Sequence, residues 1–287
     1  MTPAKPRSPL YFAWRRFADN KAALVAGAIL LLIILMAIFA PLISKTGYAD
    51  QKFLTQAYAF PQAEFWFGVD DLGRDFFTRI VYGARVSLTI GFTAAAFSLI
   101  IGIPLGAIAG YYGGRADWCV MRLIELFSVV PPLLAAMLLG ALTNGGFATI
   151  VLIAALFGWV QVCLLVRAQI KAIAQKEFVR AAQALGATPG YIIRRHLIPN
   201  AISPIIVGFV LAIPLAMMLE ASLSFLGIGV PPPIPSWGQM INVGMNFMYF
   251  YWHLAVFPTA ALAFTVLAIT LFGDGLRDAL DPTLKGR

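Results

Sequence analysis

Residues 22–43 read AALVAGAILLLIILMAIFAPLI, a stretch of 22 residues without one charged side chain. A helix that crosses the hydrocarbon core of a bilayer needs about 20 mostly apolar residues, so this stretch predicts a membrane span. The run is too long for the apolar region of a cleaved signal peptide, and it has no clear small-residue cleavage site. We therefore expect it to remain in the membrane as an anchor.

Apolar stretches of similar length recur along the rest of the chain. The 41 residues of Leu126–Val166 are too many for one span, and the turn-forming sequence 143–146 (Thr-Asn-Gly-Gly) interrupts them, so they predict two helices. With the first span, the chain is expected to cross the membrane six times. The other three predicted spans are Val86–Gly114, Leu197–Leu219 and His253–Gly273.

The composition supports an all-α membrane protein. Of the 287 residues, 60% are hydrophobic and 12% are charged, and the mean hydropathy is +0.83. Soluble domains carry about 25% charged residues. These values exclude a soluble globular domain, a disordered chain and a disulfide scaffold, because the surplus apolar surface must face lipid.

The basic residues predict the orientation of the chain. Lys and Arg gather in cytoplasmic loops, and with the N-terminus inside, 16 of the 21 lie on that side. The other five lie in one external loop. Because the basic residues follow the ends of the apolar stretches, we expect lipid rather than nucleic acid as their partner. The predicted division is a cytoplasmic segment 1–21, a first span 22–43, an external loop 44–85, a five-helix core 86–273 with a cytoplasmic loop 171–196, and a cytoplasmic tail 274–287.

The cytoplasmic loop 171–196 carries more information than a connection requires. Phe178, Ala181, Ala182 and Leu185 recur at helical spacing, and Gly186 follows where a left-handed cap is expected. Thr188 and Pro189 then predict the start of a second helix, with the threonine as its N-cap. Such a helix pair is typical either of a docking element for a soluble partner or of helices lying on the inner leaflet. The residues alone leave both open.

The predicted external loop contains three aspartates within six residues. Asp70, Asp71 and Asp75 invite a calcium interpretation, but their spacing is not that of an EF-hand loop. Asp75 as a helix cap and Arg74 paired with a carboxylate explain the stretch more simply. We therefore expect a structural role.

Glu220 lies just beyond the end of the predicted span Leu197–Leu219. An acid inside the membrane is costly and is a candidate functional residue. Glu220 lies near the outer interface, however, where a carboxylate can reach the headgroups or bond backbone amides. A structural role is favoured.

The cytoplasmic loop 171–196 resembles the EAA loop of ABC-importer permeases. Residues 179–186 (VRAAQALG) and 194–200 (RRHLIPN) place Ala181, Ala182, Gly186 and Pro199 on the positions of that motif, with Ile198 where leucine is usual. Arg180 replaces the motif glutamate, and Glu177 is the carboxylate three residues upstream. The resemblance implies that the segment around Glu177, Phe178, Arg180, Ala181, Ala182, Leu185, Gly186 and Pro199 couples the chain to ATPase subunits.

Three further stretches resemble the peptide and nickel class of these permeases. Residues 68–75, with Asp70, Gly73, Arg74 and Asp75, match its GTDxxGRD signature, and Val69 takes the threonine position. Residues 220–238 match its EASLSFLG and PSWG strings, and 273–282 match its C-terminal end. The matches run from about residue 15 to residue 282.

The chain is therefore similar to the second permease subunit of dipeptide, oligopeptide and nickel importers. This implies a type I importer permease fold in the bacterial inner membrane and half of an alternating-access pathway. The implied partners are a sister permease, two ABC ATPase subunits, which bind ATP and Mg²⁺, and an external substrate-binding protein. The implied cargo is a short peptide, with nickel or another small solute as the alternative.

The sequence offers no catalytic, metal or cofactor site. It has no Gly-Lys dipeptide and hence no phosphate-binding loop, and it lacks the HExxH and GxSxG motifs. Cys119 and Cys163 stand alone, and His196 and His253 are expected on opposite sides of the membrane. An ion-coupled carrier is the second hypothesis, but Glu220 would be its only intramembrane acid.

Overall fold

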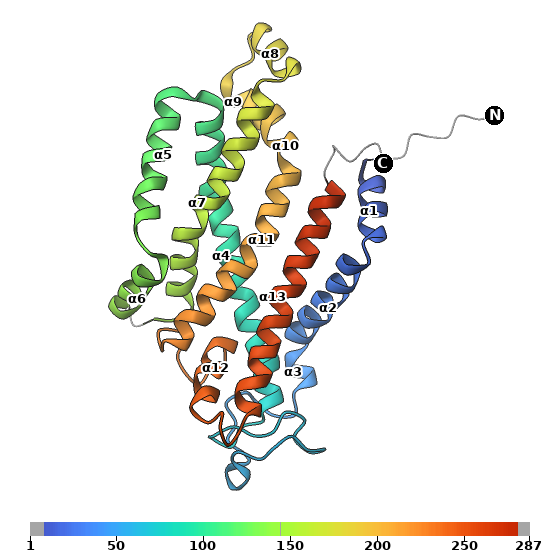
Figure 1. The fold of residues 1–287 in the computed structure, drawn as a ribbon, viewed down its shortest axis with the longest axis vertical. Coiled ribbons are helices and arrows are strands. Elements are labelled where there is room, and N and C mark those ends of the chain that lie inside the picture. Colours follow the sequence, from blue (N-terminus) through green and yellow to red (C-terminus); the bar gives the residue numbers. More distant parts are fainter. Residues whose placement is uncertain (1–8, 144, 281–287) are drawn as a thin grey trace, which may run out of the picture.

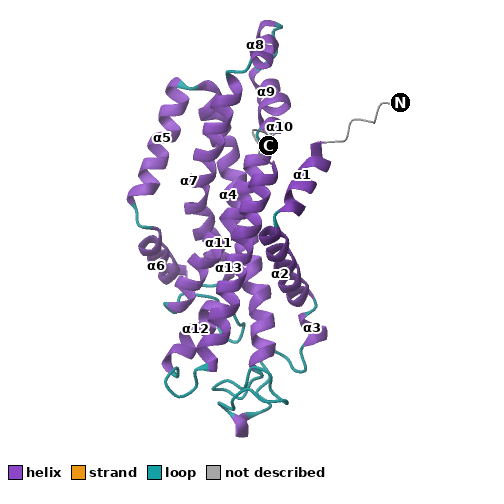
Figure 2. Cartoon of the chain, turned by 45° about the vertical axis from the view of Figure 1, so that its right-hand side comes forward, coloured by secondary structure: helices purple, strands orange, loops and turns teal. Residues whose placement is uncertain are grey.

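The computed structural model describes residues 9–143 and 145–280, and within them it is almost entirely helical, without a strand (Figures 1 and 2). The longer helices are α1 (Pro9–Asp19), α2 (Lys21–Ile38), α4 (Phe76–Tyr112), α5 (Gly114–Val129), α6 (Pro132–Thr143), α7 (Phe147–Ala174), α8 (Glu177–Ala184), α11 (Ile202–Phe225), α12 (Trp237–Asn246) and α13 (His253–Leu280). The short ones are α3 (Ala40–Ile43), the 3-10 turn η1 (Leu54–Gln56), α9 (Pro189–Ile192), the π-helical η2 (Ile193–Leu197) and α10 (Ile198–Asn200).

Five helices are long and apolar enough to cross a membrane, namely α2, α4, α7, α11 and α13. The pair α5 and α6 makes a sixth crossing if it is counted as one broken span, bent by 76°. The all-α, multi-span prediction is confirmed. The predicted break at residues 143–146 is also found, between α6 and α7.

The helices are longer than the predicted spans because they include charged residues at their ends. α4 begins at Phe76, ten residues before the expected Val86, because the Asp75 carboxylate caps it by accepting a hydrogen bond from the Thr78 amide at 2.9 Å. α5 begins at Gly114 rather than near Leu126. Charged side chains can therefore lie inside these helices, and Arg79 and Arg85, expected in a loop, belong to α4.

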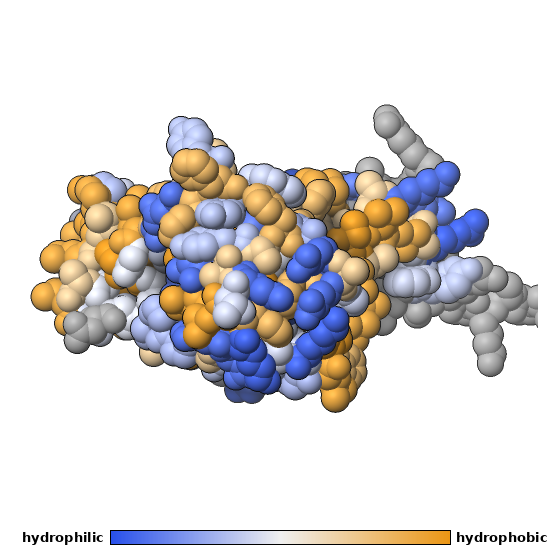
Figure 3. Space-filling view, turned by 90° about the horizontal axis from the view of Figure 1, so that it is seen from below, coloured by the Kyte–Doolittle hydropathy of each residue, from blue (hydrophilic) through white to orange (hydrophobic). Residues whose placement is uncertain are grey.

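The two ends of the bundle differ in character. α1, α8 and the last turns of α13 lie at one end, and the loop after α3 lies at the other (Figures 1 and 2). Figure 3 shows the loop end, where hydrophilic side chains gather near the middle and hydrophobic ones flank them. The side that faces the cytoplasm stays a prediction from the charges. Of the residues on which the sequence argument drew, Lys5, Arg7, Asn144, Pro282, Lys285 and Arg287 lie outside the described residues.

Three glycines allow α4 and α7 to pack backbone to backbone. Gly102, Gly106 and Gly110 recur every fourth residue, so they share one face of α4. A Cβ atom on Gly106 would lie 2.6 Å from the carbonyl oxygen of Cys163, and one on Gly110 would lie 2.7 Å from that of Arg167. Small residues at such spacing are how membrane helices approach closely.

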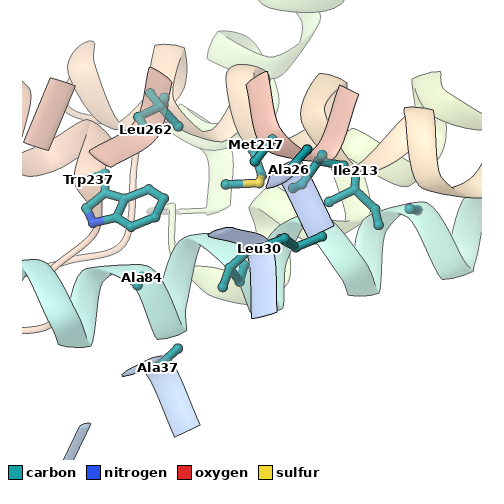
Figure 4. Packing of buried hydrophobic residues seen from close by; sticks show 13 residues of the cluster. Ala26, Leu30, Ala37, Ala84, Ile213, Met217, Trp237 and Leu262 are labelled. Atoms are coloured by element: carbon teal, nitrogen blue, oxygen red, sulfur yellow. The ribbon is translucent and has the colours of Figure 1, made fainter. Parts of the chain in front are cut away.

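A hydrophobic core joins α2, α4, α11, α12 and α13 (Figure 4). Trp237 and Met217 are buried at its centre, with Leu30 reaching them from α2 and Leu262 from α13. The Trp237 indole also donates a hydrogen bond to the Ile80 carbonyl at 3.0 Å. The start of α12 is thereby fixed against α4. Many large apolar side chains remain exposed outside the core, among them Leu31, Leu32, Phe264 and Leu267, as a lipid-facing surface requires.

Candidate functional site

The helix α8 ends as the sequence predicts. Gly186 has φ +79°, and its amide donates to the Gln183 carbonyl at 3.0 Å while the Ala187 amide donates to that of Ala182 at 3.1 Å. This double closure is a Schellman cap, which needs a left-handed residue where Gly186 lies. Thr188 differs from expectation: Pro189 does begin α9, but the Thr188 side chain makes no capping hydrogen bond to this four-residue helix.

The face on which α8 is anchored is not the predicted apolar stripe. Val179 is fully buried and Ala182 is half-buried, both against a cluster that includes Ile173 and Ile192. Phe178 is 40% exposed and Leu185 is 88% exposed. One side of α8 is therefore fixed to the bundle while Phe178, Ala181 and Leu185 point away from it. Sequence spacing missed Val179, although its β-branched side chain lies beside the stripe.

The charged residues of the loop are exposed. Glu177 lies in the first turn of α8, where a carboxylate interacts favourably with the helix dipole. Within the described part of the chain neither Glu177 nor Arg180 forms an ion pair. Pro199 lies in α10 directly after the π-helical turn and is also exposed. Whether Glu177 replaces the motif glutamate stays a prediction.

At the other end of the molecule, Asp70 organises the loop that precedes α4. Its carboxylate is buried and accepts hydrogen bonds from the amides of Leu72 and Arg74, at 3.0 and 2.9 Å. The Arg74 Nε lies 2.6 Å from Asp70 Oδ2, and the Arg79 Nε lies 3.3 Å from the same oxygen. The expected pairing of Arg74 is thus found, and Arg79 is a second partner that the sequence argument missed.

Arg79 also ties distant segments to this loop. Its guanidinium donates to the carbonyl oxygens of Tyr48, at 3.0 Å, and Pro233, at 3.3 Å. Gly73, with φ +69°, closes the turn, and a Cβ there would lie 2.5 Å from the Leu54 amide nitrogen. The signature residues therefore fold the loop and hold it on the bundle.

Asp71 differs from Asp70 in its surroundings. Its Oδ1 lies 3.7 Å from an Arg74 nitrogen and has no hydrogen-bond donor within the described residues. Burial, together with the negative charge of Asp70, raises the pKa of the Asp71 carboxyl, although Arg74 acts in the opposite direction. The ionised form of Asp71 is therefore a cost to the fold.

Glu220 does not reach the headgroups or bond backbone amides, and that expectation is wrong. Its side chain is fully buried, and its Oε1 and Oε2 accept hydrogen bonds from Ser224 at 2.7 Å and Ser87 at 3.2 Å. Ser236 adds a longer contact, 3.4 Å from its Oγ to that of Ser224. The predicted structural role is consistent with this network, which joins α4, α11 and the start of α12.

An ion pair between α5 and α7 was not predicted. Arg167 Nη2 lies 2.6 Å from Asp117 Oδ2, and a second hydrogen bond joins Arg167 Nε to Asp117 Oδ1. Fifty positions separate Arg167 from its partner along the chain. The acid in the first turn of α5 and the base in the second half of α7 were the only features of the sequence that could have indicated this ion pair.

The described residues contain no group of three or more His, Cys, Asp or Glu side chains placed to hold a metal ion. Cys163 is buried against α4, and Cys119 is exposed. His253 is buried among Phe60, Phe76, Tyr251 and Trp252 at the start of α13.

Comparison with known proteins gives consistent results over most of the chain. Residues 102–286 match the model of the family described as binding-protein-dependent transport system inner membrane component, and residues 8–61 match the N-terminal TM domain of oligopeptide transport permease C. The oligopeptide transport system permease protein OppC of Bacillus subtilis (strain 168) is 42% identical over 274 residues, 95% of this chain and 89% of that protein. The glutathione transport system permease protein GsiD of Pectobacterium atrosepticum is 39% identical over 282 residues, 97% and 93% of the two chains.

The fold is also similar to a solved structure. A chain of the MetNI methionine ABC transporter, in an inward-facing conformation, superposes with a TM-score of 0.60 at 18% identity and covers 71% of this chain and 98% of its own length. At that identity the likeness concerns the fold alone.

Proposed function

Because the chain belongs to the family of binding-protein-dependent transport system inner membrane components, we propose that it forms one half of the pathway through which an ATP-driven importer carries short peptides. The similarity to permeases named for oligopeptide, dipeptide and glutathione transport supports this cargo. The protein is a multi-pass component of the bacterial inner membrane. The other half of the pathway is a sister permease.

The exposed face of α8 is the observation that carries the proposal of coupling. Phe178, Ala181 and Leu185 project from a helix that Val179 and the Schellman cap hold rigidly on the bundle. A rigid apolar projection next to basic loop residues suits a groove on a soluble ATPase. Coupling requires that this contact differ in free energy between two ATPase states, because a contact of equal strength in both shifts no equilibrium.

We assign no catalytic role to the chain itself. The sequence lacks a phosphate-binding loop, so ATP and Mg²⁺ are assigned to the two partner ATPase subunits. The excess of basic residues supports an orientation in which α8 lies in the cytoplasm. The loop 44–75 and α12 then face the external binding protein, which delivers the peptide.

Purification of the tagged chain with its operon neighbours, followed by reconstitution, tests this function. Mass spectrometry of the complex in mild detergent should find a second permease and proteins with phosphate-binding loops. Proteoliposomes that contain ATP should then take up a labelled dipeptide when the binding protein is added outside. A chain that is stable and homogeneous alone, and that moves solute along an ion gradient, would instead support the carrier hypothesis.

A further inference from the structure

Arg180 is a cation beside the exposed face of α8 for which the chain supplies no acid. Its side chain is exposed, and it forms no ion pair within the described residues. We propose that the ATPase groove that receives α8 is acidic and that a carboxylate of the ATPase pairs with Arg180. This inference rests on the proposed function and names the chemistry of the partner at that same site.

The position of Arg180 on α8 is the first argument. Val179 is buried against the bundle, whereas Ala181 points away from it. Arg180 lies between these two residues along the chain, about 100° round the helix from each, so it flanks the exposed face. A groove that covers Ala181 and Leu185 therefore also covers part of the Arg180 side chain and brings the guanidinium close to the wall of the groove.

The loss of water from Arg180 on docking is the second argument. A charged group that loses water without gaining a partner is costly, so a stable complex must supply an acceptor. Glu177 is the only acid in the loop 171–196, and although it lies three residues earlier on the same helix, it does not pair with Arg180. The acceptor is therefore assigned to the ATPase. A carboxylate suits the role because its two oxygens match the fork of a guanidinium.

The charge around α8 is the third argument. Arg194 and Arg195 lie in η2, and the ring of His196 in the same turn packs against Phe178 with 6.2 Å between the ring centroids. Positive charge therefore adjoins the exposed face from η2 as well as from α8. Within the described part of the chain none of the cations of this loop forms an ion pair, namely Lys171, Lys176, Arg180, Arg194 and Arg195. A surface of opposite charge is the complement of this one.

An acidic protein groove fits this arrangement better than a lipid surface. In both views of the fold α8 is the outermost element at its end of the bundle, beyond the ends of α5 and α13 (Figures 1 and 2). A helix that lies on a leaflet lies beside the membrane spans and buries its apolar face among the headgroups. The exposed face of α8 is instead at the tip of the molecule, where a soluble partner can reach Leu185, which is 88% exposed.

The association of the purified ATPase with the permease pair gives the first test. In nanodiscs of phosphatidylcholine, which carry no anionic lipid, Arg180→Glu should slow association at low salt about tenfold or more, because it opposes two like charges. The difference should shrink as salt is added, since salt screens exposed charges. Arg180→Lys keeps the charge and should associate at nearly the wild-type rate. Equal association rates for Arg180→Glu and wild type would overturn the proposal.

Arg115→Glu is the matched control for this measurement. Arg115 is exposed in the first turn of α5, so its reversal changes the net charge by the same amount away from α8. This variant should bind the ATPase as wild type does. A loss as large as that of Arg180→Glu would show that the overall charge of the chain, rather than a pair at Arg180, governs binding, and would overturn the proposal.

Zero-length cross-linking gives a second test, which identifies the acid. A carbodiimide joins an amine to a carboxylate only where the two are in contact. In a chain with Lys171→Arg and Lys176→Arg, Arg180→Lys supplies the one lysine of the loop 171–196. Mass spectrometry of the complex should find position 180 joined to an Asp or Glu of the ATPase, and the same background with Arg180 retained should not give this product. Products that join position 180 only to the permeases, or no product at all, would overturn the proposal.

Charge exchange completes the second test. Replacing the cross-linked ATPase acid by lysine should restore the association of Arg180→Glu, because the pair is then re-formed with its charges reversed. Failure to restore association would show that the two residues do not act as a pair, and would overturn the proposal.

The outcomes separate this inference from the proposed function. If the wild-type chain binds no ATPase, the proposed function fails and the acidic groove fails with it. If the ATPase binds the wild type and Arg180→Glu equally, but not Leu185→Asp, then α8 is the docking element and only the acidic partner of Arg180 is wrong.

Discussion

Ser87 on α4 donates a hydrogen bond to Glu220 on α11, at 3.2 Å, although 133 residues separate them along the chain. The carboxylate also accepts from Ser224, one turn further along α11. A fully buried acid between two spans is thus bonded by hydroxyls from both. Removal of the acid would leave the buried serine donors without an acceptor.

Glu220→Ala should therefore destabilise the chain by about 2–4 kcal/mol, the combined cost of a cavity and of lost hydrogen bonds. Ser222→Ala is the matched control, because Ser222 is exposed and donates only to a carbonyl of its own helix. Thermal unfolding in detergent measures both. In the Glu220→Ala background, Ser87→Ala should cost less than it does alone. Additive effects would show that the two residues are not coupled.

Asp70→Ala should have a larger effect. The substitution leaves the guanidinium groups of Arg74 and Arg79 buried without their shared carboxylate, and breaking such a buried pair costs about 3–5 kcal/mol. Asp50→Ala removes a partner from an exposed pair with Lys52 and should have little effect on stability. Unfolding temperatures of the two variants give the comparison, and equal values would contradict the assigned role of Asp70.

The raised pKa of Asp71 predicts a pH dependence. The unfolded state holds the Asp71 carboxyl near its ordinary pKa, while burial and Asp70 raise the pKa in the folded state, so the folded state binds the proton more tightly. Stability then falls as pH rises from the ordinary carboxyl pKa to the raised value, and the cost is complete above it. Asp71→Asn should be more stable than wild type at pH 7. This advantage should shrink as the pH is lowered into the carboxyl range, and a difference independent of pH would contradict the mechanism.

Gly106→Ala should weaken the contact between α4 and α7. The added methyl group would meet the Cys163 carbonyl oxygen at 2.6 Å, so the two backbones must separate, at a cost of about 1–3 kcal/mol for overpacking. Gly190→Ala is the control, because a Cβ at Gly190 meets nothing within 4 Å. Unfolding in detergent should show a clear loss for the first variant and none for the second.

Leu185→Asp separates docking from folding. Leu185 is 88% exposed, so an aspartate there should leave the unfolding temperature of the isolated chain within about 2 °C of wild type, as surface substitutions do. In the assembled complex it should reduce peptide transport per ATP hydrolysed, because it places a charge in the apolar contact. Lys171→Ala, a change at an exposed residue at the end of α7, is the control. Wild-type transport by Leu185→Asp would argue against docking through this face.

The sequence predicted the number of membrane segments well but their ends poorly. The spans were predicted as runs without charged residues, and this rule placed the start of the second span at Val86. Arg79 nevertheless lies inside α4, because Asp70 from the preceding loop neutralises it. Asp117 and Arg167 likewise extend α5 and α7 by pairing with each other. A charged residue ends a span only when it has no partner, and partners distant in sequence are invisible to a local rule.

The same limit applies to the sites. The spacing around Gly186 predicted the end of α8, because a helix cap is a local event. The serine partners of Glu220 and the groove between α2 and α4 that Arg85 lines are made by packing between helices that are distant in the sequence. They therefore cannot be predicted from the pattern of a single segment. The local prediction at Gly186 was therefore correct, although the capping role expected of Thr188 was not found. Residues whose role is set by neighbours across the bundle were found only as unexplained polar side chains.

The row of glycines between α4 and α7 has a mechanical consequence. Because the backbones of α4 and α7 are in contact along several turns, the two helices resist both sliding past each other and separating. They are therefore expected to move as one rigid unit. In the proposed coupling, a movement that begins at α8, directly after α7, would be passed from α7 to α4. Flexing is left to the joints where the helical backbone is already interrupted, above all the 76° bend between α5 and α6.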